Sequence, residues 1–264
     1  MVARAPVRLW VSFDVARKRK KMKQAVVVGA SSGIGREVAR LLLRQGWAVG
    51  LAARREGPLQ ALADDYPGQA WVQVIDVTSD DGPRALMQLV SEMGGMDLYF
   101  HAAGVGWQNH TLEAPKELAT LATNGEGFAR MVGEAYRYFA KRRGGHIAVI
   151  SSIAGTKGLG AAPAYSATKA FQNVYVQALE QQAHMRRLPI RFTDIRPGFV
   201  RTGLLGDGAS YPMLMEPREV AEAIVRAVVR GRHVCVIDWR YRLLTFFWRL
   251  IPAALWRRMR IQTK

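Results

Sequence analysis

The stretch Gln24-Ala-Val-Val-Val-Gly-Ala-Ser-Ser-Gly-Ile-Gly35 decides the fold of this chain. Its apolar run Ala25–Val28 predicts a short buried strand, and the glycines separate that strand from the helical pattern Arg36–Gln45. Glycines permit a tight turn, and the first turn of a helix offers free N–H groups to an anion. The spacing G-x-x-x-G-x-G differs from the common dinucleotide fingerprint. The turn therefore favours a pyrophosphate site, with a tight turn lacking any ligand as the alternative.

The same alternation of strand and helix continues along the chain. Further strands are predicted at Ala48–Ala52, Trp71–Ile75, Leu98–His101, His146–Ile150, Ile190–Ile195 and Val234–Ile237, with helix-like segments such as Leu59–Ala63 between most of them. Strands that alternate with helices are joined by crossovers, which make a parallel sheet covered on both faces. We therefore predict an α/β fold, a single-domain Rossmann-type doubly wound parallel sheet with helices on both faces.

Charge is concentrated at the two ends of the 264-residue chain, whose net charge is +17. Residues 1–23 carry eight Lys or Arg against Asp14 alone, and residues 226–264 carry ten against Asp238 alone. A nucleic-acid binder usually presents its charge on the folded body. The nearly neutral body between these ends therefore argues against a nucleic-acid partner. The single cysteine, Cys235, excludes a disulfide framework and indicates a reducing compartment.

The end of the second predicted strand bears on the choice of dinucleotide. It reads Ala53-Arg54-Arg55, where an NAD-binding protein usually places an acid against the ribose hydroxyls. An arginine there would pair with the additional phosphate of NADP, and Ser32 could donate its hydroxyl to the same phosphate. This arrangement favours NADP, with a solvated arginine pair as the alternative.

A second group of motifs carries the catalytic prediction. Tyr165-Ser-Ala-Thr-Lys169 places a tyrosine and a lysine one helical turn apart, Ser151-Ser152 follows a predicted strand, and Pro197-Gly198 closes another. With the glycine turn, these motifs stand in the order found in the short-chain dehydrogenase/reductase (SDR) family. From about Gln24 to Val236 the chain resembles the ordinary single-domain branch of that family.

The resemblance implies a role for each catalytic position. Tyr165 resembles the general acid that protonates the carbonyl oxygen, and Lys169 resembles the cation that lowers the tyrosine pKa and bonds the nicotinamide ribose. Ser152 would donate to the substrate oxygen. Ser151 is the less favoured neighbour, because alternate strand residues point to opposite faces. Asn124 resembles the asparagine that holds a proton-relay water.

The resemblance also implies a cofactor set. Asp76-Val77 matches an adenine contact, and the segment from Pro197 to Thr202 matches the grip on the nicotinamide carboxamide. The expected NADP(H) contacts are Gly29, Ser31, Ser32, Gly33, Ile34, Gly35, Arg54, Arg55, Asp76, Val77, Ala103, Gly104, Tyr165, Lys169, Pro197, Gly198, Val200 and Thr202. Where the family usually has Asn-Asn-Ala-Gly, this chain has His101-Ala-Ala-Gly104, which removes asparagines that stabilise the sheet. We expect His101 to be a buried strand histidine, and no metal site is expected.

Two segments near the C-terminus concern substrate and partners. The segment Gly203–Met215 combines glycine hinges with Leu, Tyr and Met, which resembles a substrate lid for a lipophilic ketone or alcohol, with a plain surface loop as the alternative. The tail Arg240–Arg260 mixes aromatic residues, leucines and arginines. Arg249 and Pro252 interrupt it, so we predict no membrane span. It is interpreted as an interfacial helix on an anionic membrane or, equally, as a helix packed across a subunit interface.

Together these observations predict three regions. Residues 1–23 form a basic extension that is expected to be disordered and to lack signal-peptide character, residues 24–238 form an NADP-binding SDR catalytic domain, and residues 239–264 form a basic aromatic amphipathic tail. We predict an NADP(H)-dependent oxidoreductase that reduces a hydrophobic ketone (lipid, 3-oxoacyl or steroid-like), with a non-catalytic NADP-binding regulatory or scaffold protein as the alternative. A dimer or tetramer is expected in the cytoplasm, with the inner face of a membrane as a further possibility.

Overall fold

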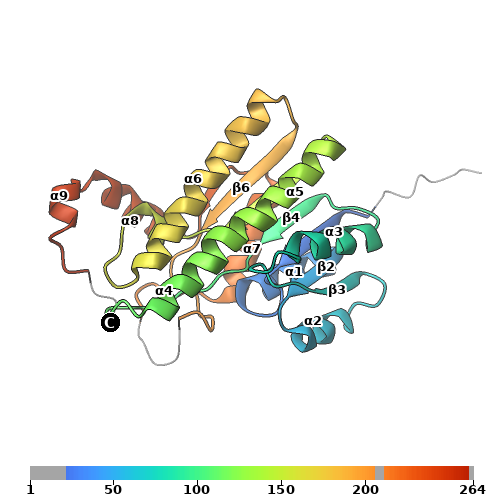
Figure 1. Ribbon diagram of the computed structural model, residues 1–264, viewed down its shortest axis with the longest axis horizontal. Coiled ribbons are helices and arrows are strands. Elements are labelled where there is room, and N and C mark those ends of the chain that lie inside the picture. The colour runs from blue at the N-terminus through green and yellow to red at the C-terminus, as the bar shows by residue number, and fades with distance from the viewer. Residues whose placement is uncertain (1–21, 206–210, 262–264) are drawn as a thin grey trace, which may run out of the picture.

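The computed structural model describes residues 22–205 and 211–261, and it contains one sheet of seven parallel strands. Their order across the sheet is β3-β2-β1-β4-β5-β6-β7 (Figure 1). The strands are β1 (Gln24–Val28), β2 (Ala48–Ala53), β3 (Ala70–Val74), β4 (Leu98–His101), β5 (Gly145–Ile150), β6 (Ile190–Arg196) and β7 (Val234–Val236). This architecture confirms the predicted doubly wound α/β fold.

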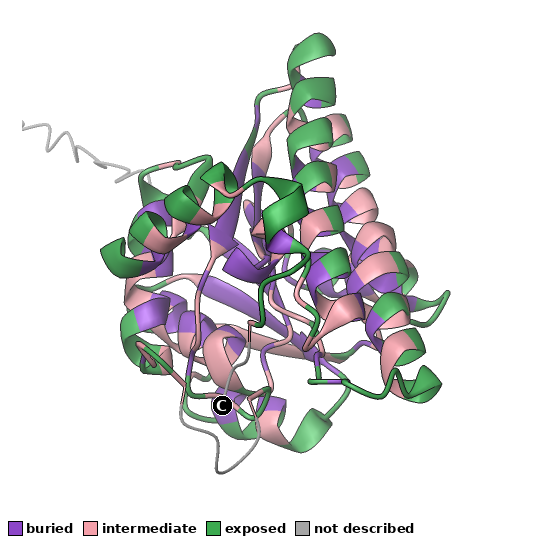
Figure 2. Cartoon of the chain, turned by 90° about the vertical axis from the view of Figure 1, so that its left-hand side faces the viewer, coloured by how far each residue is buried: buried purple, intermediate pink, exposed green. Residues whose placement is uncertain are grey.

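Helices cover both faces of the sheet and bury its side chains in two apolar cores (Figure 2). One core lies under α1 (Gly33–Arg44), α2 (Glu56–Ala63) and α7 (Pro217–Val229), and the other lies under α3 (Gly82–Glu92), α5 (Phe128–Arg142) and α6 (Pro163–Met185). The remaining elements are α4 (Ala114–Leu121), the π-helical turn η1 (Ala122–Gly127), the 3₁₀ turn η2 (Ile153–Thr156), α8 (Trp239–Leu250) and α9 (Ala253–Trp256).

The central strand β1 shows why its sequence is apolar throughout. Val27 packs into the first core and its neighbour Val26 into the second, because successive strand side chains point to opposite faces. Both faces are covered, so both sets of side chains must be apolar. Such a strand appears in sequence as a short continuous run of valines rather than as an alternating pattern.

The topology gathers the predicted site residues along one edge of the sheet. The strands are parallel, so the loops that follow β1, β4, β5 and β6 all leave at the carboxyl edge. Strand order reverses between β1 and β4, and ligands of open α/β sheets bind outside the strand ends at such a switch point. Gly29, Ala103, Ser152 and Pro197 all lie in these loops.

Two predicted segments lie partly or mostly outside the described residues. The basic extension lies outside the described residues except for its last two positions, and so does the part of the segment Gly203–Met215 that spans residues 206–210. Within the described ranges, no helix combines the length and apolar character that a bilayer crossing requires. In the same ranges, no group of three or more His, Cys, Asp or Glu side chains could hold a metal ion.

Candidate functional site

The glycine turn after β1 lies tightly against neighbouring loops. Gly29 has a φ of +95°, and a Cβ there would lie 2.6 Å from the backbone nitrogen of Ala103. A Cβ at Gly35 would lie 2.3 Å from the Gly29 carbonyl oxygen, and one at Gly33 would lie 3.2 Å from Thr202. Only glycine satisfies the close approaches at Gly29 and Gly35. The turn thereby forms a backbone cradle ahead of the α1 N-terminus, which fits a pyrophosphate.

Basic side chains border this cradle. The Arg55 guanidinium donates a 3.2 Å hydrogen bond to the Ser31 hydroxyl, and both Arg54 and Arg55 are exposed. Burial favours a higher pKa for Asp76, but hydrogen bonds from the Thr78 amide and hydroxyl, together with the charge of Arg54, hold the Asp76 pKa below its usual value. The arrangement offers two exposed guanidinium groups to an anionic group of a nucleotide.

Helix α6 positions the tyrosine and the lysine. Pro163 is its first residue, Tyr165 lies in its first turn, and Lys169 follows one turn later, with its Nζ 5.7 Å from the centre of the Tyr165 ring. The other side of the ring packs on the loop after β4, where a Cβ at Gly106 would lie 2.4 Å from the ring. The half-buried Tyr165 is therefore fixed between its helix and this loop.

The pKa of Tyr165 differs from the expected direction. Burial raises it above the ordinary value, and a hydrogen bond with the Ser152 side chain lowers it only in part. We expected Lys169 to lower it, but burial penalises the phenolate, and the same burial lowers the pKa of Lys169 to about 8 against the opposing charge of Asp194. Without a bound cofactor, Tyr165 is thus protonated at neutral pH, the form that a general acid requires.

The Lys169 ammonium is buried and makes two hydrogen bonds. It donates to the Ile150 carbonyl at 3.0 Å and to Oε1 of Gln172 at 2.9 Å. Gln172, which is completely buried, donates in turn from Nε2 to the Asn124 carbonyl oxygen at 2.8 Å. A side-chain amide therefore joins Lys169 to the backbone of Asn124.

Asn124 lies in the π-helical turn η1 and is completely buried. Its side chain clamps the loop after β4: Oδ1 accepts from the Val105 amide at 2.9 Å, and Nδ2 donates to the Val105 carbonyl at 2.6 Å. A Cβ at Gly104 would lie 3.2 Å from the same Oδ1 and 3.7 Å from the Lys169 Nζ. The structure therefore brings Asn124, Gly104 and Lys169 together.

The two serines after β5 point in different directions. Ser151 donates to the Asp194 carboxylate and to the Ile195 carbonyl, so it faces β6. The Ser152 hydroxyl accepts from the Ala154 amide at 3.0 Å and lies beside the Tyr165 side chain. The geometry thus places Ser152, and not Ser151, next to Tyr165.

The loop after β6 is closed from outside by Tyr241 of α8. A Cβ at Gly198 would lie 2.2 Å from the Tyr241 ring. The Tyr241 hydroxyl accepts from the Phe199 amide at 3.1 Å and lies 2.9 Å from the Pro212 carbonyl, to which it can donate. The predicted nicotinamide segment is therefore held by a residue of the C-terminal tail. Sequence reasoning missed this role, because α8 carries no motif.

Most of the other predicted cofactor residues pack into the apolar cores that border the candidate site. Ile34 and Val200 pack into the first apolar core and Val77 into the second, so these three can offer backbone groups or apolar contact. Ser32 is the N-cap residue just before α1, has an extended backbone and is exposed. It lies beside the glycine cradle with its hydroxyl accessible.

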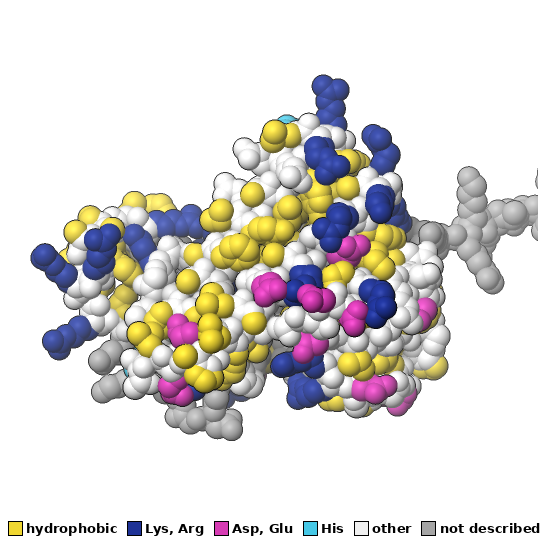
Figure 3. Space-filling view, viewed as in Figure 1, with side chains coloured by type: hydrophobic (Ala, Val, Ile, Leu, Met, Phe, Trp, Pro, Cys, Tyr) yellow, Lys and Arg dark blue, Asp and Glu magenta, His cyan; other side chains and the backbone are white. Residues whose placement is uncertain are grey.

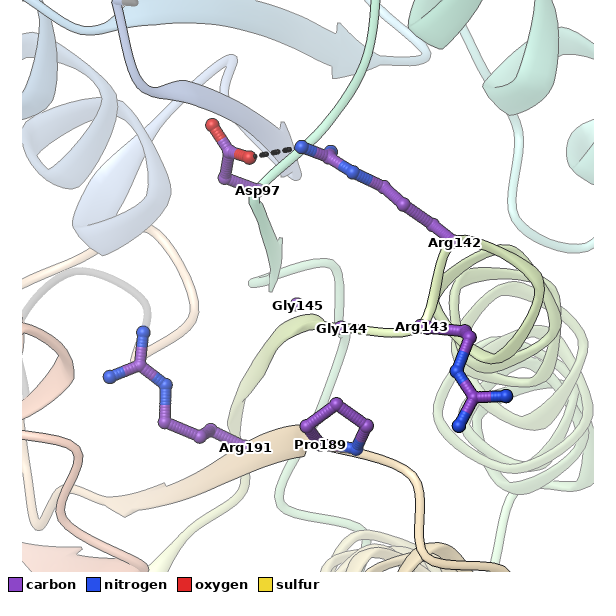
Figure 4. Close-up of a pocket in the computed structure, with 7 residues that line it drawn as sticks. All are labelled: Asp97, Arg142, Arg143, Gly144, Gly145, Pro189 and Arg191. Atoms are coloured by element: carbon purple, nitrogen blue, oxygen red, sulfur yellow. Dashed lines mark hydrogen bonds and ion pairs between the residues drawn. The ribbon is translucent and has the colours of Figure 1, made fainter. Parts of the chain in front are cut away.

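A separate hollow of about 370 Å³ lies at the opposite edge of the sheet (Figure 4). It is lined at the amino ends of β5 and β6 by Asp97, Arg142, Arg143, Gly144, Gly145, Pro189 and Arg191. Arg142 forms a 2.6 Å ion pair with Asp97. None of the predicted catalytic or cofactor residues lines this hollow, so it is distinct from the site around Tyr165.

The model of the short chain dehydrogenase family matches residues 23–210. The chain therefore belongs to the short chain dehydrogenases, a family of oxidoreductases. An uncharacterised oxidoreductase of Myxococcus xanthus is 34% identical over 241 residues, which cover 88% of this chain and 94% of that protein. An uncharacterised oxidoreductase of Staphylococcus saprophyticus is 32% identical over 81% of this chain and 94% of its own length.

Solved structures share the fold at lower sequence identity. A short-chain dehydrogenase from Sphingobium yanoikuyae in complex with NADPH aligns with a TM-score of 0.75 and 23% identity, covering 90% of this chain and 97% of its own. The closed form of a serine dehydrogenase complexed with NADP⁺ aligns with a TM-score of 0.71 and 23% identity, covering 81% and 94%. Both likenesses support the same doubly wound architecture.

Proposed function

We propose that this chain is an NADP(H)-dependent reductase of hydrophobic carbonyl compounds. The observation that carries the proposal is the constellation around Tyr165, whose side chain lies beside the Ser152 hydroxyl and whose ring centre lies 5.7 Å from the Lys169 ammonium. A donor hydroxyl, a second hydroxyl and a cation in one place are what the reduction of a carbonyl to an alcohol requires.

The protein's part in the proposed reaction follows from these positions. Bound NADPH would supply the hydride. Ser152 would donate a hydrogen bond to the carbonyl oxygen and orient it toward Tyr165. The Tyr165 hydroxyl would give its proton to that oxygen as negative charge develops there. Lys169 would stabilise the resulting phenolate and help to restore its proton.

The preference for NADP(H) over NAD(H) is inferred from the arginines at the edge of the glycine cradle. Arg54 and Arg55 are exposed there, and Arg55 is steadied by the Ser31 hydroxyl. The solved relatives in complex with NADP⁺ and NADPH agree with this choice. A guanidinium favours the 2′-phosphate, whereas an acid at this position would select NAD.

A fluorescence titration checks this preference. We expect NADPH to bind at least about ten-fold more tightly than NADH, since one charge-assisted contact contributes more than about 1.4 kcal/mol. The variant Arg54→Asp should reduce or reverse the preference. Exposed Arg44, at the far end of α1, provides the control Arg44→Asp, which should keep the preference. Equal affinities of the native protein for the two dinucleotides would contradict the proposal.

A hydrophobic substrate is favoured by the side chains of the adjoining loops. Trp107 is 42% exposed next to Gly106, on which the Tyr165 ring packs, and Leu204 is 42% exposed just after Thr202. Tyr211 packs against Phe199 with ring centres 4.7 Å apart. Exposed or half-buried apolar residues beside a polar reaction centre suit a carbonyl group on an apolar body.

The function is tested by NADPH oxidation against ketones and 3-oxoacyl thioesters of graded chain length. We expect turnover that rises with apolar length and is lost in Tyr165→Phe, while NADPH still binds. If no member of the panel reacts although NADPH binds, the non-catalytic alternative gains the advantage.

We further propose a homo-oligomer with the reducing cytoplasm as its compartment. Apolar side chains form a band over α5 and α6 in Figure 3. On α6, Phe171 is 41% and Val174 is 65% exposed, and on α4 Leu118 is 63% exposed. Packing against a second copy would remove this surface from water.

A further inference from the structure

The outward face of α8 is an apolar stripe. Positions spaced by four, three and four residues fall on one side of a helix, and here they are 49–70% exposed: Trp239, Leu243, Phe246 and Leu250. The opposite side carries Tyr241 and Thr245, which are buried against the body of the protein. The helix is therefore apolar on its outer face as well as anchored through its inner face. Burial in the protein's own core does not explain the outer stripe.

Positive charge surrounds the stripe. The segment 239–261 contains no Asp or Glu, and all of its arginines are exposed: Arg240, Arg242, Arg249, Arg257, Arg258 and Arg260. Within residues 22–205 and 211–261, Arg240 alone among these six arginines forms an ion pair with a carboxylate, that of Asp238 at 2.6 Å. Figure 3 shows dark-blue and yellow side chains intermixed at the end of the molecule where Figure 1 places α8 and α9.

The stripe is held firmly at the catalytic edge of the sheet. Besides the contacts of Tyr241, the Lys157 ammonium donates to the Ile251 carbonyl at 2.9 Å, and the Trp256 indole donates to the Gly158 carbonyl at 2.8 Å. Residues 157–158 follow the turn that begins at Ser152. Any surface bound by α8 therefore lies on the side of the molecule where these loops border the candidate site.

We propose that the outer face of α8 docks on an anionic phospholipid bilayer. Aromatic and leucine side chains among arginines match the boundary between acyl chains and acidic headgroups. A second copy of the chain suits this face less well, because a symmetric contact would set arginine against arginine. Combined with the proposed function, on which this last step rests, docking would bring carbonyl compounds dissolved in the membrane to the site.

Vesicle flotation tests the docking without any measurement of activity. The full-length protein is mixed with vesicles of phosphatidylcholine alone or of phosphatidylcholine with phosphatidylglycerol. We expect binding to the anionic vesicles, and at least ten-fold weaker binding for the double variant Leu243→Ser/Phe246→Ser. Arg242→Gln and Arg249→Gln should each weaken it about five-fold. Val229→Ser, which alters an exposed apolar residue on α7, should bind like the native protein.

Two outcomes would overturn the proposal. Binding that is unchanged in Leu243→Ser/Phe246→Ser would assign it to another part of the chain. Absent vesicle binding, with conversion of an oligomer to monomers in the same variant, would make the stripe a subunit interface. Turnover of a water-soluble ketone should be equal in the native protein and this variant, so a failed activity assay would count against the proposed function and leave the docking result intact.

Discussion

At the scale of single residues, the contact with the most direct chemical consequence is made by Gln172. Its amide accepts from the Lys169 ammonium and donates to the Asn124 carbonyl. An oxygen that accepts a hydrogen bond from the lysine ammonium stabilises the charged form of the lysine. Gln172 thus supports the protonation of Lys169, whose pKa burial lowers to about 8.

This role can be read from the pH dependence of reduction. We expect kcat to fall as the pH rises through about 8, because Lys169 then loses its proton. Gln172→Leu should lower kcat about ten-fold and move this alkaline limb down by about one pH unit, whereas Gln172→Glu should move it up. KM should change little in either variant. Alkaline limbs that coincide in all three proteins would show that Gln172 only fills space.

The sequence was a good guide to individual residues where spacing carries chemistry. The separation of Tyr165 from Lys169 predicted their stacking on one helix, and strand alternation predicted that Ser152 rather than Ser151 faces Tyr165. Gln172 was missed, although it lies three positions after Lys169 on the same helix face. A glutamine at that spacing is common on exposed helices, and only burial reveals its function.

At the scale of elements, the Tyr241 hydroxyl of helix α8 holds the backbone of the loop after β6. Tyr241→Phe should destabilise the protein by about 1–3 kcal/mol, because the Phe199 amide loses its partner. It should also weaken NADPH binding several-fold, since the Phe199 amide, in the predicted nicotinamide segment, is no longer held by the Tyr241 hydroxyl. Urea unfolding and a fluorescence titration measure these two effects.

Tyr138 provides a matched control at the other edge of the sheet. Its hydroxyl accepts from the Met96 amide at 3.1 Å, just before β4 begins. Tyr138→Phe should therefore cost a similar amount of stability and leave the affinity for NADPH unchanged. If both variants bind NADPH equally weakly, the effect of Tyr241→Phe comes from a general loss of stability and not from lost support of the loop.

Element positions were predicted closely because the strands are short, apolar and buried on both faces. Leu98–His101 was predicted with the bounds it has, and the other strands differ by one residue at one end or, for β3, at both ends. The tail was harder, because its sequence is apolar on two sides. The alternatives of membrane helix and interface helix both concern its outer face, and neither anticipated that Tyr241 on the inner face contacts Gly198.

At the scale of the whole molecule, two buried histidines couple folding to pH. Burial, aided by the charge of Lys169, lowers the pKa of His101 to about 3, and burial with Arg191 lowers that of His146 to about 4. The folded protein keeps both neutral at pH 5, but the unfolded chain protonates them below about 6.5. Stability should thus fall as the pH drops through 6.5 toward 4.

The expected loss between pH 7 and pH 5 is about 2 kcal/mol for each histidine. Urea unfolding at the two pH values measures it. In the double variant His101→Asn/His146→Gln, this part of the loss should vanish, leaving only the contribution of the other titratable groups. An undiminished loss in that variant would show that other groups cause the acid sensitivity.

The global arrangement was predictable because alternation of strands and helices leaves few topologies. The close approaches that shape the site were not predictable, because the spacing of glycines in the sequence does not indicate which segment packs against them. The contacts of Gly29 with Ala103 and of Gly106 with Tyr165 join segments that are far apart in sequence. These approaches follow from the finished packing of the sheet.

The anchoring of Tyr241 also has a genetic consequence. A stop codon or frameshift just after β7 would remove fewer than thirty residues and spare every family motif, yet it would strip the outer wall from Gly198 and the partner from the Phe199 amide. Such alleles should behave as null alleles of the whole enzyme, not as versions that lack an appendage. Loss of the outer face of α8 would cost only the proposed docking, whereas loss of the helix would cost the loop that it holds.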